Sequence, residues 1–174
     1  MHRFVALLVV ALAPVWAAGE LSGRRAPGFS LPDVKLAQHD LGDYRGKVVV
    51  LEIMLTSCPH CGKFAPLLEE LAKKYAGRLQ VLSVVNPPDN TATVSKFMAD
   101  YKLSYPMLFD CGQVAGSYMK ATPQKPSFDI PHLFLIDQNG QIRNDWAYGT
   151  FTRPIFEGRA LFDEVEKLFS NAKK

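Results

Sequence analysis

Two cysteines separated by two residues, Cys58 and Cys61, are the residues of this chain whose type and spacing best suit chemistry. A disulfide between them would close a loop too short to remove much entropy from the unfolded chain, so it would stabilise the fold little. A pair at this spacing is better suited to accept and release electrons by thiol-disulfide exchange. We therefore take Cys58-Pro59-His60-Cys61 as a candidate redox-active dithiol.

The position of each cysteine relative to a predicted helix assigns its role. Apolar residues recur at helical spacing from Phe64 to Tyr75, so a helix is expected directly after Cys58. The unpaired N–H groups and the dipole at its start favour a thiolate at Cys58, the predicted nucleophile. Cys61, one turn into the helix, is then the resolving thiol. His60 adds positive charge that would make the disulfide a stronger oxidant; a solvated His60 without this role is the alternative.

Metal binding is another use of two cysteines at this spacing. Structural zinc needs two further ligands at a compatible spacing, whereas Cys111 stands alone and His39 and His132 are scattered. Haem attachment needs a histidine directly after the second cysteine, where this chain has Gly62. We expect no metal or other cofactor. Cys111 is predicted to be a buried thiol that packs as a small hydrophobe, with a second redox or intermolecular role as the alternative.

Strand and helix patterns alternate around the dithiol, which is typical of an α/β sheet with parallel strands. An N-terminal extension rich in turn residues, 21–45, is expected to form a hairpin. The Asn139-Gly140 pair predicts a second hairpin near the end of the chain. The predicted strands are 47–55, 79–85, 105–109, 133–137 and 142–146, and the predicted helices after the first are 92–101 and 155–169.

The N-terminus has the pattern of a secretory signal peptide, 1–17. Met1-His2-Arg3 precedes an uncharged run, 4–15, and Val15 and Ala17 supply small residues before a cut after Ala17. A membrane anchor or a buried core helix is the alternative, but the run is short for a span and is interrupted by Pro14. Export is expected, to the periplasm if the source is a Gram-negative bacterium, with no stable membrane span after cleavage. Removing Arg3 lowers the net charge from +3 to +2, which gives no reason to expect a nucleic-acid partner. One domain, 18–174, remains.

From about Ala26 to its end the chain resembles the thioredoxin superfamily, and specifically the exported thiol-disulfide oxidoreductases of the TlpA/ResA type. The resemblance is carried by the segment 43–50 (DYRGKVVV), Cys58-Pro59-His60-Cys61, Pro66 inside the following helix and the segment 131–140 (PHLFLIDQNG). It implies a thioredoxin fold: a central mixed sheet with helices on both faces, preceded by an N-terminal β-hairpin extension. The partners it implies are protein thiol or disulfide substrates and a membrane or soluble redox partner.

Two further site features follow from the resemblance. It implies that Ile130-Pro131 is a cis peptide beside the cysteines, where the residue before proline offers its backbone to an incoming peptide. Glu52 lies six residues before Cys58, at the place of a buried acid that moves protons for the resolving cysteine. Burial should raise its pKa and make it a base near neutrality. A strand-end carboxylate paired with a surface lysine is the alternative; the next strand offers Ser83 where thioredoxins have lysine.

Three departures from the family pattern bear on specificity. Ser57 precedes Cys58 where the family usually has tryptophan, and the segment 121–128 is longer than the usual link. The Pro59-His60 pair between the cysteines is the one typical of the oxidase DsbA, so the direction of electron flow stays open.

Two other functions compete with this interpretation. A peroxidase of the peroxiredoxin type needs Thr or Ser three residues before its cysteine and Pro seven before, where this chain has Leu55 and Leu51. A copper-binding chaperone would use Cys58, Cys61 and His132 as ligands.

Overall fold

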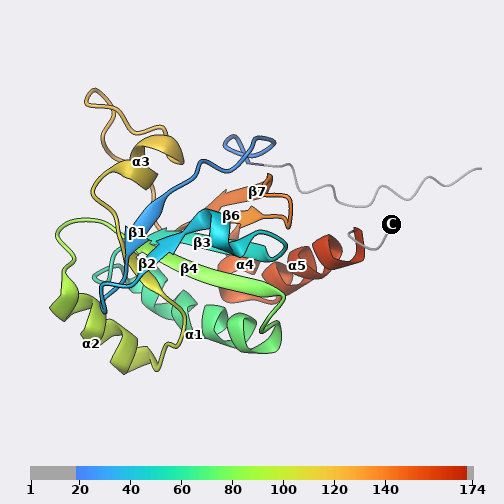
Figure 1. Ribbon diagram of the computed structural model, residues 1–174, viewed down its shortest axis with the longest axis horizontal. Helices are drawn as coiled ribbons and strands as arrows, with labels where there is room; N and C mark the ends of the chain where they lie inside the picture. Colours follow the sequence, from blue (N-terminus) through green and yellow to red (C-terminus); the bar gives the residue numbers. More distant parts are fainter. Residues whose placement is uncertain (1–18, 172–174) are drawn as a thin grey trace, which may run out of the picture.

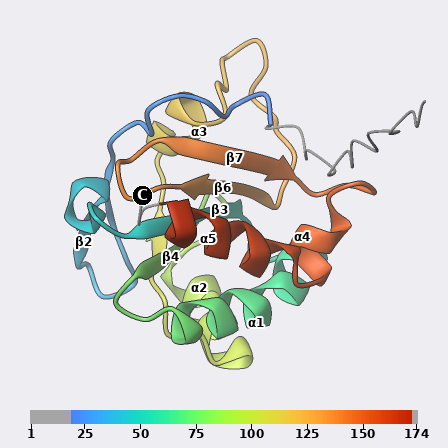
Figure 2. The same cartoon turned by 90° about the vertical axis from the view of Figure 1, so that its right-hand side faces the viewer.

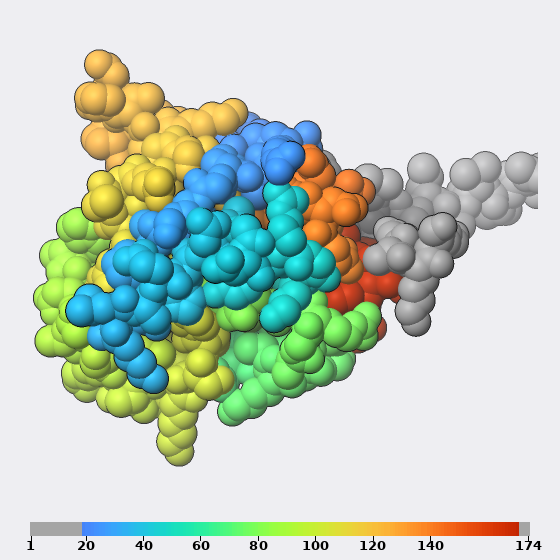
Figure 3. All heavy atoms as spheres, in the orientation of Figure 1, coloured from blue at the N-terminus to red at the C-terminus, as the bar shows by residue number. Residues whose placement is uncertain are grey.

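The computed structural model describes residues 19–171, and its N-terminal part is a hairpin laid on the sheet. Strands β1 (Ser30–Pro32) and β2 (Gln38–Asp40) pair antiparallel, and a short 3-10 helix, η1 (Leu41–Tyr44), follows. The predicted hairpin extension is therefore confirmed. Figure 3 shows residues 20–45, in blue to cyan, lying across the molecule beside the yellow segment that contains the short helix α3 (Gln113–Ser117). The predicted signal peptide, 1–17, falls outside the described residues.

A five-stranded mixed sheet forms the centre, in the order β5-β4-β3-β6-β7. Strands β3 (Val48–Met54), β4 (Leu79–Val85) and β5 (Met107–Phe109) run parallel, whereas β6 (His132–Ile136) and β7 (Ile142–Ala147) run antiparallel to their neighbours. Every residue of β3 is buried, as its β-branched and apolar run requires of a central strand covered on both faces. The sheet thus matches the predicted strands to within two residues at each end.

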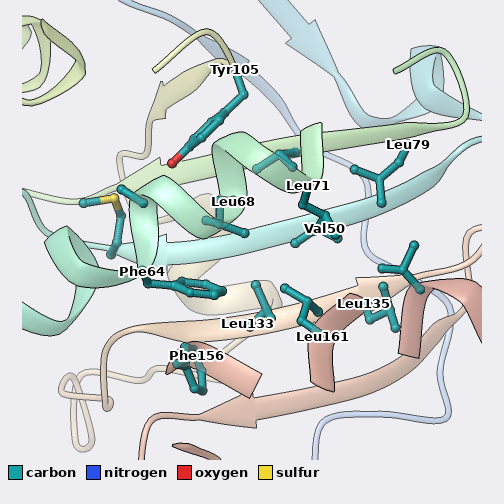
Figure 4. Packing of buried hydrophobic residues seen from close by; sticks show 14 of the residues in the cluster. Val50, Phe64, Leu68, Leu71, Leu79, Tyr105, Leu133, Leu135, Phe156 and Leu161 are labelled. Atoms are coloured by element: carbon teal, nitrogen blue, oxygen red, sulfur yellow. The ribbon is translucent and has the colours of Figure 1, made fainter. Parts of the chain in front are cut away.

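Most helices cover one face of the sheet (Figures 1 and 2). Helices α1 (Pro59–Lys74), α2 (Thr91–Tyr101), α4 (Arg153–Glu157) and α5 (Ala160–Asn171) contribute to one core cluster with the sheet. Figure 4 shows Phe64, Leu68 and Leu71 of α1 pointing toward the strands, with Phe156 and Leu161 approaching from α4 and α5. This packing fixes the start of α1 against the sheet.

The opposite face is covered by the N-terminal extension and by the short helix α3 (Gln113–Ser117). Phe29 and Leu31 pack there with Tyr118, whose hydroxyl donates a 2.8 Å hydrogen bond to the carbonyl of Pro27. Leu51 and Phe134 of the sheet complete this second core. The expected helices on both faces are therefore present.

The single closing helix predicted over 155–169 is wrong, because the chain forms α4 and α5 with a break at Gly158. Gly158 is extended, with φ −120° and ψ −156°, and a Cβ atom there would lie 2.9 Å from the carbonyl oxygen of Pro154. Apolar spacing continues across the break because Ile155, Phe156 and Leu161 all face the same core. Within residues 19–171, no helix combines the length and apolarity needed to cross a membrane.

Candidate functional site

The first site residue, Cys58, lies at the end of the turn that connects β3 to α1. Its N–H donates a 3.1 Å hydrogen bond to the Leu55 carbonyl, which closes the connecting turn. Cys58 is the N-cap of α1, and its sulfur accepts a 3.4 Å hydrogen bond from the N–H of Cys61. Pro59 occupies the first turn, where its missing N–H costs no helical hydrogen bond. The half-buried Cys58 sulfur therefore faces the open end of the helix.

The turn before Cys58 is held by Asp89, on the connection between β4 and α2. Its carboxylate accepts a 2.8 Å hydrogen bond from the Thr56 N–H and a second bond from the Thr56 hydroxyl. It also accepts a 2.9 Å bond from the hydroxyl of Thr93 in the first turn of α2. Asp89 thus fixes the position of the residues that present Cys58, a role that no local sequence pattern indicated.

Cys61 lies directly behind Cys58 and is fully buried. Burial raises the pKa of its thiol well above the ordinary value, and the negative charge of Glu52 raises it further. Both cysteines are free thiols in this structure. The exposed and buried sulfurs of the dithiol therefore sit in different environments, and the buried thiol needs a base to ionise.

Glu52 is the buried acid expected beneath the dithiol. It is fully buried in β3 and pairs in register with Ser83 of β4, whose hydroxyl donates a 2.5 Å hydrogen bond to Oε2. Burial raises the pKa of Glu52 to about 7, although the Ser83 hydrogen bond acts in the opposite direction. Its Oε1 has no hydrogen-bond partner among the described residues. The alternative of a strand-end carboxylate paired with a surface lysine is therefore wrong.

Tyr105 is a second buried polar group near Glu52, and no sequence pattern pointed to it. It is 3% exposed, and its hydroxyl has no hydrogen-bond partner within residues 19–171. Burial, followed by the charge of Glu52, raises the pKa of Tyr105 well above its usual range. The hydroxyl therefore stays protonated and can donate to a neighbouring group.

Ile130-Pro131 is a cis peptide, as the resemblance implied. It directly precedes β6. Because Ile53 of β3 pairs with His132 of β6, the peptide lies at the same end of these two strands as the turn that carries Cys58. The carbonyl of Pro131 accepts a 3.1 Å hydrogen bond from the N–H of Tyr148, while Ile130 is half-buried. The structure thus brings Ile130, Pro131 and Cys58 to one end of the sheet.

His60 is half-buried and packs face to face on Tyr148, with ring centroids 4.0 Å apart and ring planes at 25°. Its Nδ1 atom is buried and has no hydrogen-bond partner among the residues described. The interpretation of His60 as a freely solvated side chain therefore fails. Tyr148 follows β7, 88 residues further along the chain, so local sequence reasoning could not find this contact.

The side chain of His132, which directly follows Pro131, pairs with Asp145 of β7. Its Nε2 lies 3.1 Å from Asp145 Oδ2, and Asp145 also accepts a hydrogen bond from the Ser22 hydroxyl. Although burial opposes it, the hydrogen bonds from His132 and Ser22 hold the pKa of Asp145 below its usual range. Within residues 19–171, no three His, Cys, Asp or Glu side chains form a group that could hold a metal ion. His132 thus does not complete a ligand set with the cysteines.

A cavity of about 720 Å³ opens beside the cis peptide on the His132 side. The longer link 121–128 contributes to its wall through Lys125, Ser127 and Phe128, and Asp129 lines it next to Ile130. The segment that departs from the family pattern therefore borders the site.

The prediction that Cys111 is buried is wrong: its side chain is exposed. Asp110 turns inward instead, and its carboxylate accepts hydrogen bonds of 3.1 and 2.9 Å from the N–H groups of Val114 and Ala115 in α3. Because Asp110 caps α3 from inside, the next side chain points outward. Gly112 follows with φ 104°, a conformation that favours glycine.

Comparisons with known proteins agree with this geometry. The profile of the AhpC/TSA family matches residues 22–145. Thiol-disulfide oxidoreductase ResA of Geobacillus kaustophilus (strain HTA426) is 33% identical over 136 residues, which are 78% of this chain and 74% of that protein. The thioredoxin-like protein YneN of Bacillus subtilis (strain 168) is 29% identical over 147 residues, which are 83% of this chain and 82% of its own.

Solved structures show the same fold. A thiol:disulfide interchange protein of the thioredoxin family from Chlorobium tepidum TLS has a TM-score of 0.70 at 18% identity, covering 83% of this chain and 95% of its own. A thiol:disulfide interchange protein from Bacteroides sp. has a TM-score of 0.68 at 21% identity, covering 88% and 93%. The chain belongs to the AhpC/TSA family, as a thioredoxin-fold relative of the ResA thiol-disulfide oxidoreductases.

Proposed function

We propose that this chain exchanges disulfides with exported protein substrates through Cys58 and Cys61. The observation that supports this most strongly is the half-buried Cys58 sulfur at the start of α1, with the fully buried Cys61 thiol directly behind it. The Cys58 thiolate attacks a substrate disulfide, so that a mixed disulfide forms and one substrate thiolate leaves. Cys61 then attacks the Cys58 sulfur and releases the second substrate thiol. Two electrons pass to the substrate, and the reverse sequence oxidises a dithiol.

Glu52 assists the second step as a proton acceptor. Cys61 must ionise before it can attack, and its burial makes the thiol weakly acidic. Glu52 is the buried base in the same region, with a pKa of about 7 and with Oε1 free of hydrogen bonds from the described residues. The proton therefore passes from the Cys61 thiol to Glu52 as the Cys58–Cys61 disulfide forms.

Substrate binds along the edge formed by Ile130 and Pro131. Ile130 is half-buried and lies beside the turn that presents Cys58, which suits backbone hydrogen bonding to an extended peptide. The cavity lined by Phe128 and Asp129 continues from this edge and gives the longer link 121–128 a role in choosing substrates.

The direction of electron flow is decided by the reduction potential of the dithiol. We expect His60 to favour the dithiol form, because a cation or dipole beside the Cys58 sulfur stabilises the thiolate. Equilibration with glutathione buffers, followed by thiol alkylation, measures the potential. A value of about −230 mV or above supports an oxidase or isomerase, whereas one near −270 mV supports a reductase.

Residues 1–17 direct the chain out of the cytoplasm in this proposal, and 18–174 act as one domain. Expression of the full chain in a Gram-negative host, fractionation and intact-mass measurement test it. A periplasmic product that begins at Ala18 is expected. An uncleaved chain held in the membrane fraction would instead support the anchor.

The two competing functions gain no support from the geometry. Leu51 is fully buried and Leu55 offers no hydroxyl, so the positions that a peroxidase of this fold needs are apolar. His132, the third proposed copper ligand, is engaged with Asp145. Peroxide consumption by the reduced protein tests the first function, and Cu(I) titration of the reduced protein tests the second. We expect no catalytic turnover of peroxide and no Cu(I) site that includes His132.

A further inference from the structure

The ring of Tyr148 stacks on His60, which lies between the two cysteines of the dithiol motif. Its N–H donates to the carbonyl of Pro131, and its hydroxyl donates to Oε1 of Glu157 in α4. The edge of its ring meets Phe156, with centroids 5.5 Å apart and planes at 66°. Its backbone, hydroxyl and ring are each fixed by a different contact, so the ring offers His60 a rigid surface.

This surface determines where the imidazole of His60 lies. The two rings stack at 4.0 Å, and His60 Nδ1 is buried without a hydrogen-bond partner among residues 19–171. No hydrogen bond to Nδ1 therefore orients the ring, and the stack with Tyr148 takes that role. An imidazole that is free to rotate away into solvent would act on the Cys58 sulfur only part of the time.

We propose that Tyr148, anchored by Glu157, is a positioning residue that holds the His60 imidazole beside Cys58 and thereby sets the balance between the dithiol and the disulfide. This inference rests on the redox-tuning role proposed above for His60. Tyr148 also connects two parts of the site, because its N–H donates to the carbonyl of Pro131 and its ring stacks on His60 of the dithiol motif.

Glu157 acts by holding the Tyr148 hydroxyl in a hydrogen bond, and not by placing its negative charge near the Cys58 sulfur. The Tyr148 hydroxyl holds the pKa of Glu157 below its usual range, and the charges of Arg153, Lys63 and His60 act in the same direction. The carboxylate therefore stays ionised and keeps its hydrogen bond to the phenol. A direct charge effect on Cys58 would have the opposite sign, because a nearby anion disfavours the thiolate.

A double-mutant cycle of reduction potentials tests the inference. We would measure the glutathione equilibrium of the wild type, His60→Ala, Tyr148→Ala and the double variant. The His60→Ala substitution is expected to make the disulfide about tenfold harder to reduce, about 30 mV. Tyr148→Ala should shift the equilibrium in the same direction by about half of this or more on the logarithmic scale. In the His60→Ala background, Tyr148→Ala should change nothing further.

Three further variants make the test specific. Phe151→Ala is the matched control, because Phe151 lies in the same turn, is 89% exposed and makes no stacking contact with His60; its potential should equal that of the wild type. Tyr148→Phe keeps the ring but loses the Glu157 bond, so a smaller shift in the same direction is expected. It also replaces Tyr148→Ala if that variant does not fold. Glu157→Gln should follow Tyr148→Phe in sign.

Each outcome separates the two claims. If His60→Ala leaves the potential unchanged, the tuning role in the proposed function fails and Tyr148 has nothing to position. If His60→Ala shifts the potential but Tyr148→Ala does not, or if the two shifts add, the positioning role of Tyr148 is wrong while the role of His60 stands. A Glu157→Gln shift toward an easier reduction would replace the anchor with a direct charge effect.

Discussion

The hydroxyl of Ser83 donates a 2.5 Å hydrogen bond to Oε2 of Glu52, and both residues are fully buried at paired positions of β4 and β3. This bond stabilises the ionised carboxylate, whereas burial favours the neutral acid more strongly. The pKa of Glu52 is therefore held at about 7, where a carboxyl group can both take and return a proton.

Ser83→Ala should move the pH dependence of the second exchange step to higher pH. Without the hydroxyl, the ionised form of Glu52 loses its donor while burial remains, so the pKa rises above about 7. The rate at which the mixed disulfide is resolved, followed by quenched flow across the neutral range, reports this midpoint. Ser104→Ala, which removes a 2.7 Å hydroxyl bond to Glu69, is the matched control and should leave the midpoint in place. A midpoint that stays fixed or falls in Ser83→Ala would argue against Glu52 as the titrating base.

Glu52→Gln should slow resolution of the mixed disulfide more than its formation. Formation depends on Cys58 at the start of α1, whereas resolution needs the buried Cys61 thiol to lose its proton. Rapid mixing of the reduced enzyme with an oxidised model peptide separates the two steps. Equal slowing of both steps, or of neither, is inconsistent with a proton-transfer role.

The stability of the dithiol form should fall as pH rises from about 4.5 to about 7. Glu52 has a higher pKa in the folded protein than in the unfolded chain, so the folded state keeps a proton that the unfolded state releases in this window. Below about 4.5 the acid is neutral in both states and the contribution is fully present; above about 7 it is lost. The loss is on the order of 3 kcal/mol, since one pKa unit corresponds to about 1.4 kcal/mol.

Urea unfolding of the wild type and Glu52→Gln at several pH values measures this loss. The difference between the two proteins removes the other titrating groups from the comparison. The free energy of unfolding of Glu52→Gln, relative to that of the wild type, should increase as pH rises from about 4.5 to about 7. A constant difference would show that Glu52 titrates at its ordinary value.

Asp89→Ala should loosen the turn that presents Cys58. The substitution removes the acceptor for the Thr56 N–H and for two threonine hydroxyls. We expect a loss of about 1–2 kcal/mol in the free energy of unfolding and a slower first exchange step, with the second step unaffected. Asp100→Ala, which removes a surface ion pair with Lys96, is a suitable control for loss of an acidic side chain. Unchanged kinetics in Asp89→Ala would mean that the turn holds its shape without the carboxylate.

Local patterns predicted the parts of the site that lie within one strand, turn or helix. The apolar spacing after Cys58 predicted the helix that begins at the dithiol, and Glu52 stood out as the one charge in the apolar run of β3, although its role as the buried acid came from the resemblance. The Ile130-Pro131 cis peptide required the family resemblance in addition, since a proline before a strand does not by itself define its isomer.

Contacts between segments that are far apart along the chain could not be predicted from local sequence patterns. The Thr56–Asp89 bond joins residues 33 apart, and the His60–Tyr148 stack joins α1 to the end of β7. Cys111 is predicted to be buried because cysteine is often buried. In the structure the neighbouring Asp110 side chain points inward to accept hydrogen bonds from α3, so the Cys111 side chain points outward. Gly158 is a residue at which a helix commonly ends, but the apolar spacing that continues past it favours a single helix over 155–169.

Trapping of the mixed disulfide tests the central claim most directly, namely that Cys58 attacks and Cys61 resolves. Reduced Cys61→Ser and Cys58→Ser proteins would be mixed with an oxidised peptide substrate and the products identified by mass spectrometry. The half-buried Cys58 and the fully buried Cys61 predict a stable adduct on Cys58 in Cys61→Ser, and no adduct at Cys61 in Cys58→Ser. An adduct that forms through Cys61 in Cys58→Ser, and none on Cys58 in Cys61→Ser, would contradict the account.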